Sequence, residues 1–232
     1  MMSYWVLFIG IAVASWLVQM NLQNKFKKYS KIPTGNGMTG RDVALKMLHD
    51  NGIYDVQVTH TPGQLTDHYN PANKTVNLSE GVYESNSIMA AAVAAHECGH
   101  AVQHARMYAP LKMRSALVPV VNFSSSIMTW VLLGGILLFN TFPQLLWIGI
   151  ILFATTTLFS FITLPVEINA SKRALVWLSS SGITNSYNHT QAEDALRSAA
   201  YTYVVAALGS LATLIYYCLL YTSPSPRDRT RS

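Results

Sequence analysis

Charged residues are scarce in this chain of 232 residues. Lys, Arg, Asp and Glu make up 12% of it, about half the share of a typical soluble domain, while hydrophobic residues make up 50%. This balance excludes a chain that is soluble along its whole length. It indicates a membrane protein with room for one modest polar domain.

Cysteine is scarcer still, with only Cys98 and Cys218. The last dozen residues, YTSPSPRDRTRS, form a turn-rich, low-complexity string that resembles read-through of foreign sequence, starting from about Cys218. Without that tail Cys98 stands alone, so no internal disulfide is possible, which fits a reducing cytoplasmic face. The tail also carries a net +2 of the formal charge of +5. The remaining excess requires no nucleic-acid partner, and no nucleic-acid motif is present.

Long apolar runs, by contrast, are abundant. Four windows have the length of about 20 residues that a helix needs to cross a bilayer. They are Tyr4–Met20, Ala116–Asn140, Leu145–Leu164 and Tyr201–Tyr221. The start of the second window is not fixed by the sequence, because Pro119 and three consecutive serines interrupt it.

The first window has two interpretations. The AVA segment at residues 12–14 resembles a signal-peptide cleavage site, but the leading MMS has no positive charge, which a secretory signal normally carries. The basic residues come after the window instead. We therefore interpret it as a retained anchor rather than a cleaved signal peptide.

The basic residues also predict the orientation of the spans. They lie after the first window, before the second, and between the third and fourth (Lys25, Lys27, Lys28, Lys31, Arg106, Lys112, Arg114, Lys172, Arg173 and Arg197). The NTFPQ link between the second and third windows has none. By the positive-inside rule, the N-terminus lies outside and both polar segments face the cytoplasm.

The first polar segment predicts a helix, a small sheet and a second helix. Thr39 is a plausible N-cap for an amphipathic helix that stops at Gly52. Alternating apolar and polar residues around Pro-Gly and Asn-Pro predict short strands near Val56–Thr59 and Thr75–Leu78, paired antiparallel. An alanine-rich helix follows, from Ser85 or Ser87 to Met107. This is too little to bury a large core alone, so we expect it to rest on the membrane helices.

A metal centre is predicted in that second helix, where residues 94–100 read AAHECGH. His96 and His100 are four residues apart and so share one helix face, where both imidazoles can reach one zinc ion. Glu97 lies beside the first histidine and can take a proton from water that zinc acidifies. This is the H-E-x-x-H arrangement of zinc proteases.

A catalytic zinc needs a third protein ligand. His104 continues the same face, but eight helical residues separate it from His96, about 12 Å, which is too far for one metal. Glu167 is favoured, because a carboxylate at the cytoplasmic end of the third window is costly unless partnered. A surface pair with Lys172 or Arg173 is the alternative for Glu167. Glu193, Asp194 and His189 are weaker candidates.

Small residues support the choice of Glu167. Ala170 and Ala174 follow it at a spacing that lets two helices approach closely.

Two long segments carry a resemblance to a known family. AAHECGHAVQHARMYAPLKMRSALVPVVNF and LPVEINASKRAL, with TGRDVALKML and LTDHYNPANKTVNLS, resemble the bacterial neutral zinc metallopeptidases of the YugP type, which are similar in plan to HtpX-like membrane gluzincins. The resemblance covers nearly the whole chain up to the fourth window. It implies one zinc ion held by His96, His100 and Glu167, with Glu97 as general base. It also implies a place in the bacterial cytoplasmic membrane.

Several other residues have weaker claims. The segment of Thr75, Val76 and Asn77 resembles the edge strand on which metalloproteases hold an extended peptide, or else is a covered structural strand. Tyr69 either donates to a developing oxyanion or packs beneath the turn. Asp67 and His68 support the site or belong to the turn. Cys98 points away from the ligand face, and a nucleophilic role for it is disfavoured.

The predicted fold class is a mostly α-helical membrane protein with about four transmembrane helices and a small, zincin-like α+β domain. The predicted segments are an anchor (1–21), the α+β segment (22–115), a membrane hairpin (116–164), the segment with the third ligand (165–200), a fourth span (201–221) and the foreign tail (222–232).

The predicted function is a zinc-dependent endopeptidase that cleaves protein or peptide substrates, including membrane proteins, at the cytoplasmic surface of the bilayer. The alternative is a membrane protein that binds or senses zinc without turnover, with a fourth ligand such as His189 or His104. A small transporter is disfavoured, because the predicted spans have almost no ionisable residues in their middle.

Overall fold

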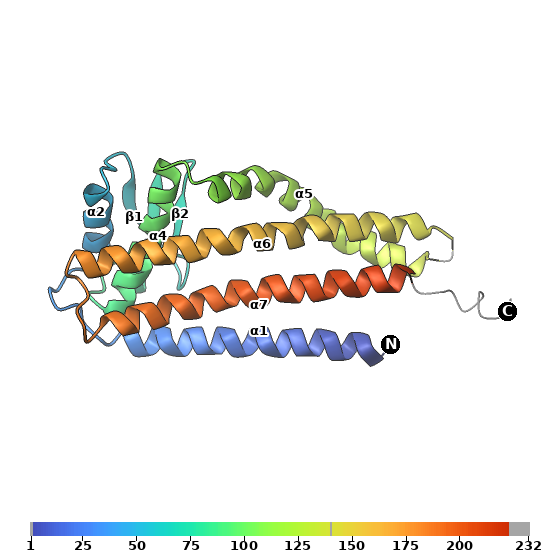
Figure 1. The fold of residues 1–232 in the computed structure, drawn as a ribbon, viewed down its shortest axis with the longest axis horizontal. Coiled ribbons are helices and arrows are strands. Elements are labelled where there is room, and N and C mark those ends of the chain that lie inside the picture. The colour runs from blue at the N-terminus through green and yellow to red at the C-terminus, as the bar shows by residue number, and fades with distance from the viewer. Residues whose placement is uncertain (1, 140, 223–232) are drawn as a thin grey trace. The chain divides into compact units, whose positions relative to one another are not determined.

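The computed structural model describes residues 2–139 and 141–222. Asn140, the last residue of the second predicted window, and nearly all of the predicted foreign tail lie outside the described residues. The chain is mostly helical, with one small sheet (Figure 1). The elements are α1 (Met2–Tyr29), α2 (Gly40–Asp50), β1 (Gln57–Thr61), β2 (His68–Asn70), β3 (Thr75–Ser79), α3 (Glu80–Tyr83), α4 (Ile88–Ala105), α5 (Ala109–Leu137), α6 (Pro143–Ser180) and α7 (His189–Thr222).

Four of the described helices, α1, α5, α6 and α7, are long and apolar enough to cross a membrane. They contain the first, third and fourth predicted windows and extend beyond them. Helix α5 covers the second window only as far as Leu137, and Leu138 and Phe139 lie in a turn. The uncertain start of the second window is resolved, because α5 runs unbroken through Pro119 from Ala109. Pro165 likewise lies inside α6, which continues as a helix to Ser180.

The chain divides into two compact units, of which the first consists of membrane-length helices. It combines Met113–Ile162 with the beginning of α1 and the last part of α7. Leu132, Leu146 and Ile150 form its buried cluster. Glycine is required where α5 meets α6, since a Cβ at Gly135 would lie 2.6 Å from the Leu146 Cα.

The second unit contains residues 16–112 and 163–203 and holds the predicted metal-binding residues. Its core combines α2, β3 and α4 with the last part of α6 and the start of α7, through residues such as Leu178 and Leu196. The expectation that the small polar segment needs support from the long helices is confirmed.

The two predicted helix caps are present. Thr39 and Asp42 form a reciprocal capping box at the start of α2, and the Ser87 side chain accepts a hydrogen bond from the Ala90 N–H at the start of α4. Each cap satisfies main-chain donors that the first helical turn leaves without a partner. The start of α4 is thereby set at Ile88, eight residues before His96.

The sheet differs from the prediction in its pairing. Its order is β1-β3-β2, with β1 parallel to β3 and β2 antiparallel to β3. The predicted antiparallel pairing of the first and last strands is wrong, because a third, three-residue strand, β2, lies between them in the sequence and pairs with β3. The chain reverses once before β2 and again after it, so β3 runs in the same direction as β1.

Candidate metal centre

Three side chains from two helices converge in the second unit. His96 and His100 come from α4 and Glu167 from α6, and one ligand atom from each lies within 4.8 Å of the other two. The Glu167 Oε2 atom lies 3.3 Å from His96 Nε2 and 3.5 Å from His100 Nε2. Glu167 and His100 are buried, and His96 is partly buried.

The two imidazole rings are arranged around this point rather than stacked. Their centroids are 4.8 Å apart and their planes meet at 85°. One helical turn separates them, so the same face of α4 presents both Nε2 atoms to Glu167. The alternative of a surface pair between Glu167 and Lys172 or Arg173 is wrong, because Glu167 is 3% exposed and its carboxylate faces the histidines.

Small residues allow the two helices to meet at this depth. A Cβ added to Gly99 would lie 2.7 Å from the Ala170 main-chain oxygen, so only glycine fits there without a shift of the backbone. Ala170 and Ala174 are fully buried on the facing side of α6. The predicted close approach is confirmed, and it brings Glu167 within reach of α4.

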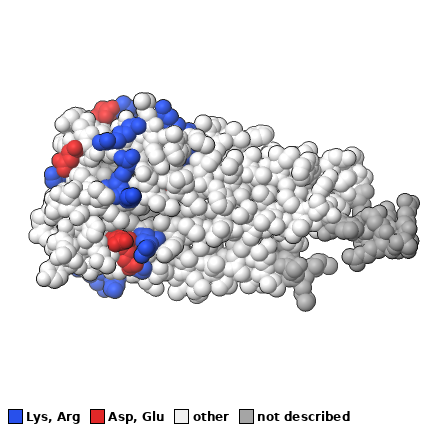
Figure 2. All heavy atoms as spheres, in the orientation of Figure 1, with Lys and Arg blue, Asp and Glu red and all other residues white. Residues whose placement is uncertain are grey.

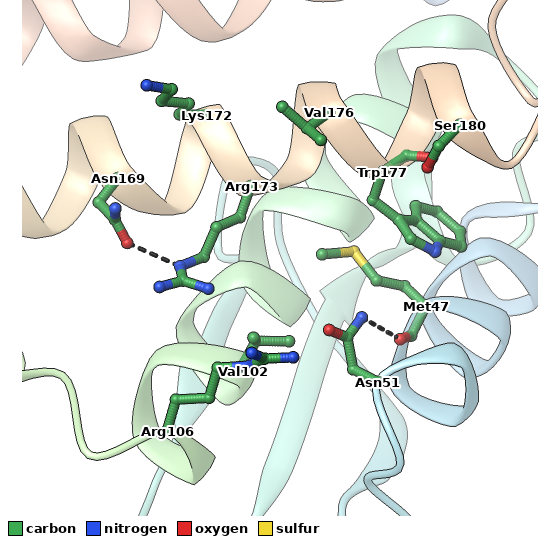
Figure 3. Close-up of a pocket in the computed structure, with 10 residues that line it drawn as sticks. All are labelled: Met47, Asn51, Val102, Arg106, Asn169, Lys172, Arg173, Val176, Trp177 and Ser180. Carbon is green, nitrogen blue, oxygen red and sulfur yellow. Dashed lines mark hydrogen bonds between the residues drawn. The ribbon is translucent and has the colours of Figure 1, made fainter.

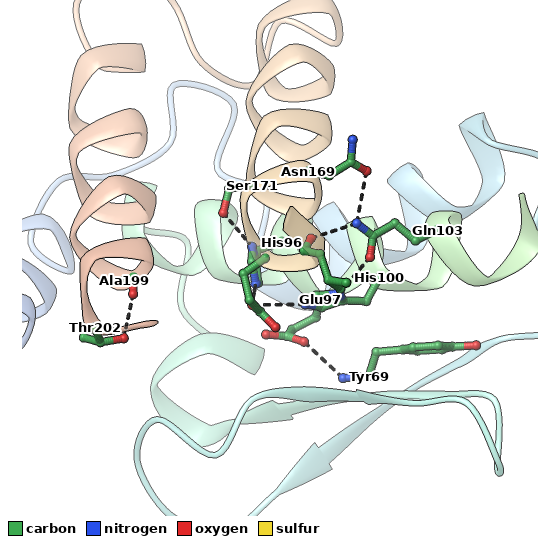
Figure 4. Close-up of polar contacts among 11 residues, drawn as sticks. Tyr69, His96, Glu97, His100, Gln103, Asn169, Ser171, Ala199 and Thr202 are labelled. Atoms are coloured by element: carbon green, nitrogen blue, oxygen red, sulfur yellow. Dashed lines mark hydrogen bonds and ion pairs between the residues drawn. The ribbon is translucent and has the colours of Figure 1, made fainter. Parts of the chain in front are cut away.

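Hydrogen bonds hold both histidine rings by their other nitrogen (Figure 4). His100 Nδ1 donates to Gln103 Oε1 at 3.0 Å. His96 Nδ1 lies 3.0 Å from the Ser171 hydroxyl. Partners of this kind fix the tautomer and leave the Nε2 lone pair for a metal.

Gln103 in turn is fixed by α6. Its Nε2 donates to the Val166 main-chain oxygen at 2.8 Å and to Asn169 Oδ1 at 3.0 Å. Arg173 Nε donates to the same Asn169 oxygen at 2.7 Å. The orientation of His100 therefore depends on a chain of polar groups that crosses from α4 to α6.

The charges around His96, His100 and Glu167 favour a bound cation. Burial disfavours the charged form of His100, but its hydrogen bond with Glu167 and the charges of Glu97 and Glu167 outweigh burial, so the pKa of His100 is raised. A buried carboxylate between two imidazoles requires a positive partner. A divalent metal satisfies that requirement through the same three atoms.

Glu97 lies next to this group without belonging to it. Its side chain is 8% exposed, and its Oε2 atom accepts a hydrogen bond from the Tyr69 main-chain N–H at 3.0 Å. Figure 4 shows Tyr69 presenting its backbone nitrogen to Glu97 while its ring points away. Strand β2 therefore holds the carboxylate at the edge of the site.

The remaining acid and histidine candidates have other partners. His104 is hydrogen-bonded to the Tyr69 hydroxyl through Nδ1, and His189 to the Thr184 hydroxyl. The Asp194 carboxylate accepts from Lys25 and Tyr29. None of these residues, nor Glu193, belongs to the three-residue group found among the described residues.

Two weaker predictions are also decided by the structure. Asp67 accepts hydrogen bonds from the Ser79 N–H and hydroxyl, so it ties the start of β2 to the end of β3. His68 donates from Nδ1 to the Thr66 oxygen within the same turn. Cys98 is fully buried, and burial raises the pKa of its thiol, which leaves it inert.

The interpretation of Thr75, Val76 and Asn77 as an edge strand is wrong. β3 is the central strand, paired with β1 on one side and β2 on the other. Edge positions belong to β1 and β2 instead. The alternative of a covered structural strand describes these residues correctly, as Val76 is completely buried.

Three supporting residues were missed at the sequence level. Gln103 is three residues after His100, and Ser171 is four after Glu167, so each shares a helix face with the ligand it follows. That spacing is the signal that could have found them. Asn169 carries no such signal, because its role depends on Gln103 and Arg173 being near.

The donor set fits zinc. Two imidazoles and one carboxylate are one of the ligand sets found in catalytic zinc sites, which keep a fourth position for water. Both imidazoles also have the outer hydrogen bonds that such ligands require. The fold and the site together define a membrane protein with a candidate mononuclear zinc centre.

Comparison with known proteins agrees with this class. The chain belongs to the family described as "Putative neutral zinc metallopeptidase", whose profile matches residues 4–222. It is 42% identical over 220 residues to the "Putative membrane protease YugP" of Bacillus subtilis (strain 168), covering 93% of this chain and 97% of that protein. The resemblance inferred from the sequence is confirmed. No solved structure matches the chain.

Proposed function

We propose that this protein is a membrane-embedded, zinc-dependent endopeptidase that cleaves protein substrates at the cytoplasmic surface of the membrane. The observation that carries the proposal is the convergence of His96, His100 and Glu167 on one point, with the Glu97 carboxylate beside them and outside the ligand set. Membership of a zinc metallopeptidase family supports it.

Each residue has a separate task in this proposal. The two histidines and Glu167 would hold one zinc ion, which supplies a Lewis acid that polarises the scissile carbonyl and acidifies water. Glu97 takes the proton of the attacking water and then passes it to the leaving amine. The Tyr69 N–H fixes one Glu97 oxygen, so the other oxygen is left to handle the proton.

The outer edge of β2 is the place for the substrate backbone. In an antiparallel pair, alternate residues direct both main-chain groups away from the partner strand. Tyr69 is such a residue, because its N–H reaches Glu97 rather than β3. Strand addition on this edge would align an extended peptide beside Glu97. The substrate-binding role proposed for Thr75–Asn77 is thereby transferred to β2.

The position of the basic residues supports a cytoplasmic site. The positive-inside rule assigns the segments around Lys25–Lys31 and Lys172–Arg173 to the cytoplasmic side. The ligands lie in the same unit as these residues. Substrates of such a site are membrane proteins, their loops, or damaged chains near the bilayer.

The decisive experiment compares wild type with Glu97→Gln in detergent. Zinc content is measured by mass spectrometry, and cleavage is followed on casein and on a membrane-protein substrate. We expect one zinc per chain in both, and cleavage by the variant reduced by roughly a hundredfold to ten-thousandfold. His96→Ala is the matched control and should lose both zinc and activity.

Two results would contradict the proposal. Full activity of Glu97→Gln would remove Glu97 as the base. Zinc in both proteins, with no cleavage of any substrate by either, would favour the non-catalytic zinc-binding or sensing alternative. That alternative predicts a fourth protein ligand, yet His104 and His189 are engaged elsewhere.

A further inference from the structure

A second polar site lies in the same unit, in a pocket between α2, α4 and α6. It has a volume of about 440 Å³. The residues that line it are Met47, Asn51, Val102, Arg106, Asn169, Lys172, Arg173, Val176, Trp177 and Ser180. Glu167 and Ser171 lie on another face of α6, so the pocket contains none of the candidate ligands. Asn169 and Arg173 belong both to the pocket and to the hydrogen-bond chain that orients His100.

Three of the lining residues are basic and none is acidic. Arg106 comes from the end of α4, while Lys172 and Arg173 come from α6. In Figure 3 the side chains of Arg106 and Arg173 extend into the space between the two helices, whereas Lys172 points away from it. Two guanidinium groups directed into one space repel each other unless an anion lies between them.

The described residues do not supply that anion. Among the described residues, no carboxylate lies within 4.0 Å of Arg106, Lys172 or Arg173. Asp50 accepts a hydrogen bond from Trp177 of the pocket wall, but its charge is paired with Lys46 at 3.0 Å. On the face drawn in Figure 2, one group of basic side chains lies apart from acidic ones, while the others lie beside acidic side chains.

A hydrogen bond within α6 fixes the position of the Arg173 side chain. Its Nε donates to Asn169 Oδ1, the oxygen that also accepts from Gln103. This hydrogen bond leaves the two terminal nitrogens of the guanidinium for a second partner. An arginine fixed in this way loses less side-chain freedom when it binds an oxyanion with two parallel hydrogen bonds.

We propose that this pocket binds the phosphate group of an anionic ligand, presented by the headgroup of an anionic phospholipid. Guanidinium pairs match phosphate oxygens in geometry as well as charge. The other half of the wall is apolar, through Val102, Val176 and Trp177. Basic pockets on the cytoplasmic side of membrane helices bind such headgroups.

The position of the pocket along α6 agrees with a lipid source. The pocket residue on α6 nearest the membrane is Asn169. It follows Leu164, the end of the predicted apolar window, by five residues, which is about 7.5 Å along a helix. A headgroup layer extends several ångströms beyond the hydrocarbon boundary. Free inorganic phosphate has the same chemistry and is the second source to be tested.

The test measures ligand binding to the full chain in detergent by native mass spectrometry. The probes are dioleoyl phosphatidylglycerol, dioleoyl phosphatidylcholine and inorganic phosphate. The variants are Arg106→Gln and Arg173→Gln. Arg41→Gln is the matched control. Arg41 is exposed on α2 and does not line the pocket, and its replacement removes the same charge. Arg106 is the cleaner of the two test positions, since Arg173 also holds Asn169.

We expect one phosphatidylglycerol per wild-type chain in preference to phosphatidylcholine. The affinity of the protein for phosphatidylglycerol should fall about fivefold for each pocket arginine removed and should not change in Arg41→Gln. Binding should also weaken with added salt in wild type, a result that does not depend on any variant folding. Arg106→Lys should retain part of the affinity, because it keeps the charge but loses the paired hydrogen bonds.

The remaining outcomes separate the sources. Binding of inorganic phosphate, but not of phosphatidylglycerol, with the same dependence on Arg106 would keep the anion site and overturn its lipid source. Binding of neither probe, or equal losses in Arg41→Gln and Arg106→Gln, would overturn the site itself. Neither result bears on the zinc content, so failure here is distinguishable from failure of the peptidase proposal.

Discussion

The Gln103 side chain donates a hydrogen bond to the Val166 main-chain oxygen at 2.8 Å, one residue before Glu167. The same side chain accepts from His100, so one glutamine connects two of the three candidate ligands. Gln103 is completely buried, and its removal would leave the Val166 oxygen without this partner in the interior. This connection between α4 and α6 leads to the first prediction.

Gln103→Leu should weaken zinc binding ten- to a hundredfold while leaving all three candidate ligands in place, because His100 loses the partner that orients its ring. Competition with a chelator measures the affinity. Gln64→Leu, at an exposed position, is the matched control and should bind zinc as wild type does. Equal affinity of Gln103→Leu and wild type would show that packing alone orients His100.

Gly99→Ala should destabilise the protein by about 1–3 kcal/mol, since the added methyl group would meet the Ala170 oxygen and push α4 away from α6. The unfolding temperature and the zinc content should both fall. A methyl group at Gly81 meets nothing within 4 Å, so Gly81→Ala is the control. Normal zinc content in a destabilised Gly99→Ala protein would separate helix approach from metal binding.

The Tyr69 N–H should contribute to turnover by holding Glu97. Tyr69→Pro removes this donor from an edge strand, whereas Tyr69→Ala removes the ring and keeps the donor. Hydrogen bonds to charged groups correspond to about 1.5–3 kcal/mol, so kcat of the proline variant should lie roughly ten- to a hundredfold below that of the alanine variant. Equal kcat values in the two variants would exclude this role, and circular dichroism would check the fold of both.

Acid should weaken the start of α2. The hydrogen bonds from the Thr39 side chain and main chain lower the pKa of Asp42, so Asp42 stabilises the fold above its ordinary pKa. That contribution is lost as the pH falls through the lowered value. Thr39→Ala should cost about 1 kcal/mol at neutral pH and reduce the acid dependence, as measured by unfolding at a series of pH values. An unchanged acid profile would assign the dependence to other carboxylates.

The cytoplasmic orientation can be tested by labelling a single cysteine. Tyr54 is 77% exposed between α2 and β1, and Cys98 is buried with a raised thiol pKa. In a Cys218→Ser background, Tyr54→Cys should react with an impermeant maleimide in inverted vesicles and remain unlabelled in intact cells. Labelling in intact cells would reverse the proposed topology.

The sequence by itself determined the local features of this protein. The cost of placing polar groups in hydrocarbon requires runs of about 20 apolar residues, so the four candidate spans could be recognised from composition. The i, i+4 spacing that places His96 and His100 on one face is a property of any helix. The caps at Thr39 and Ser87 are equally local, because each involves residues within one turn.

Tertiary structure decided what depends on distant segments. Glu167 lies 71 residues after His96. The sequence favoured it over Glu193 and Asp194, but the contact itself depends on the packing of α6 on α4 through Gly99 and Ala170. The sheet order could not be predicted either, since β2 has three residues and pairs only because β3 lies beside it. Contacts of this kind arise from shape and burial between elements, which no periodicity within one element records.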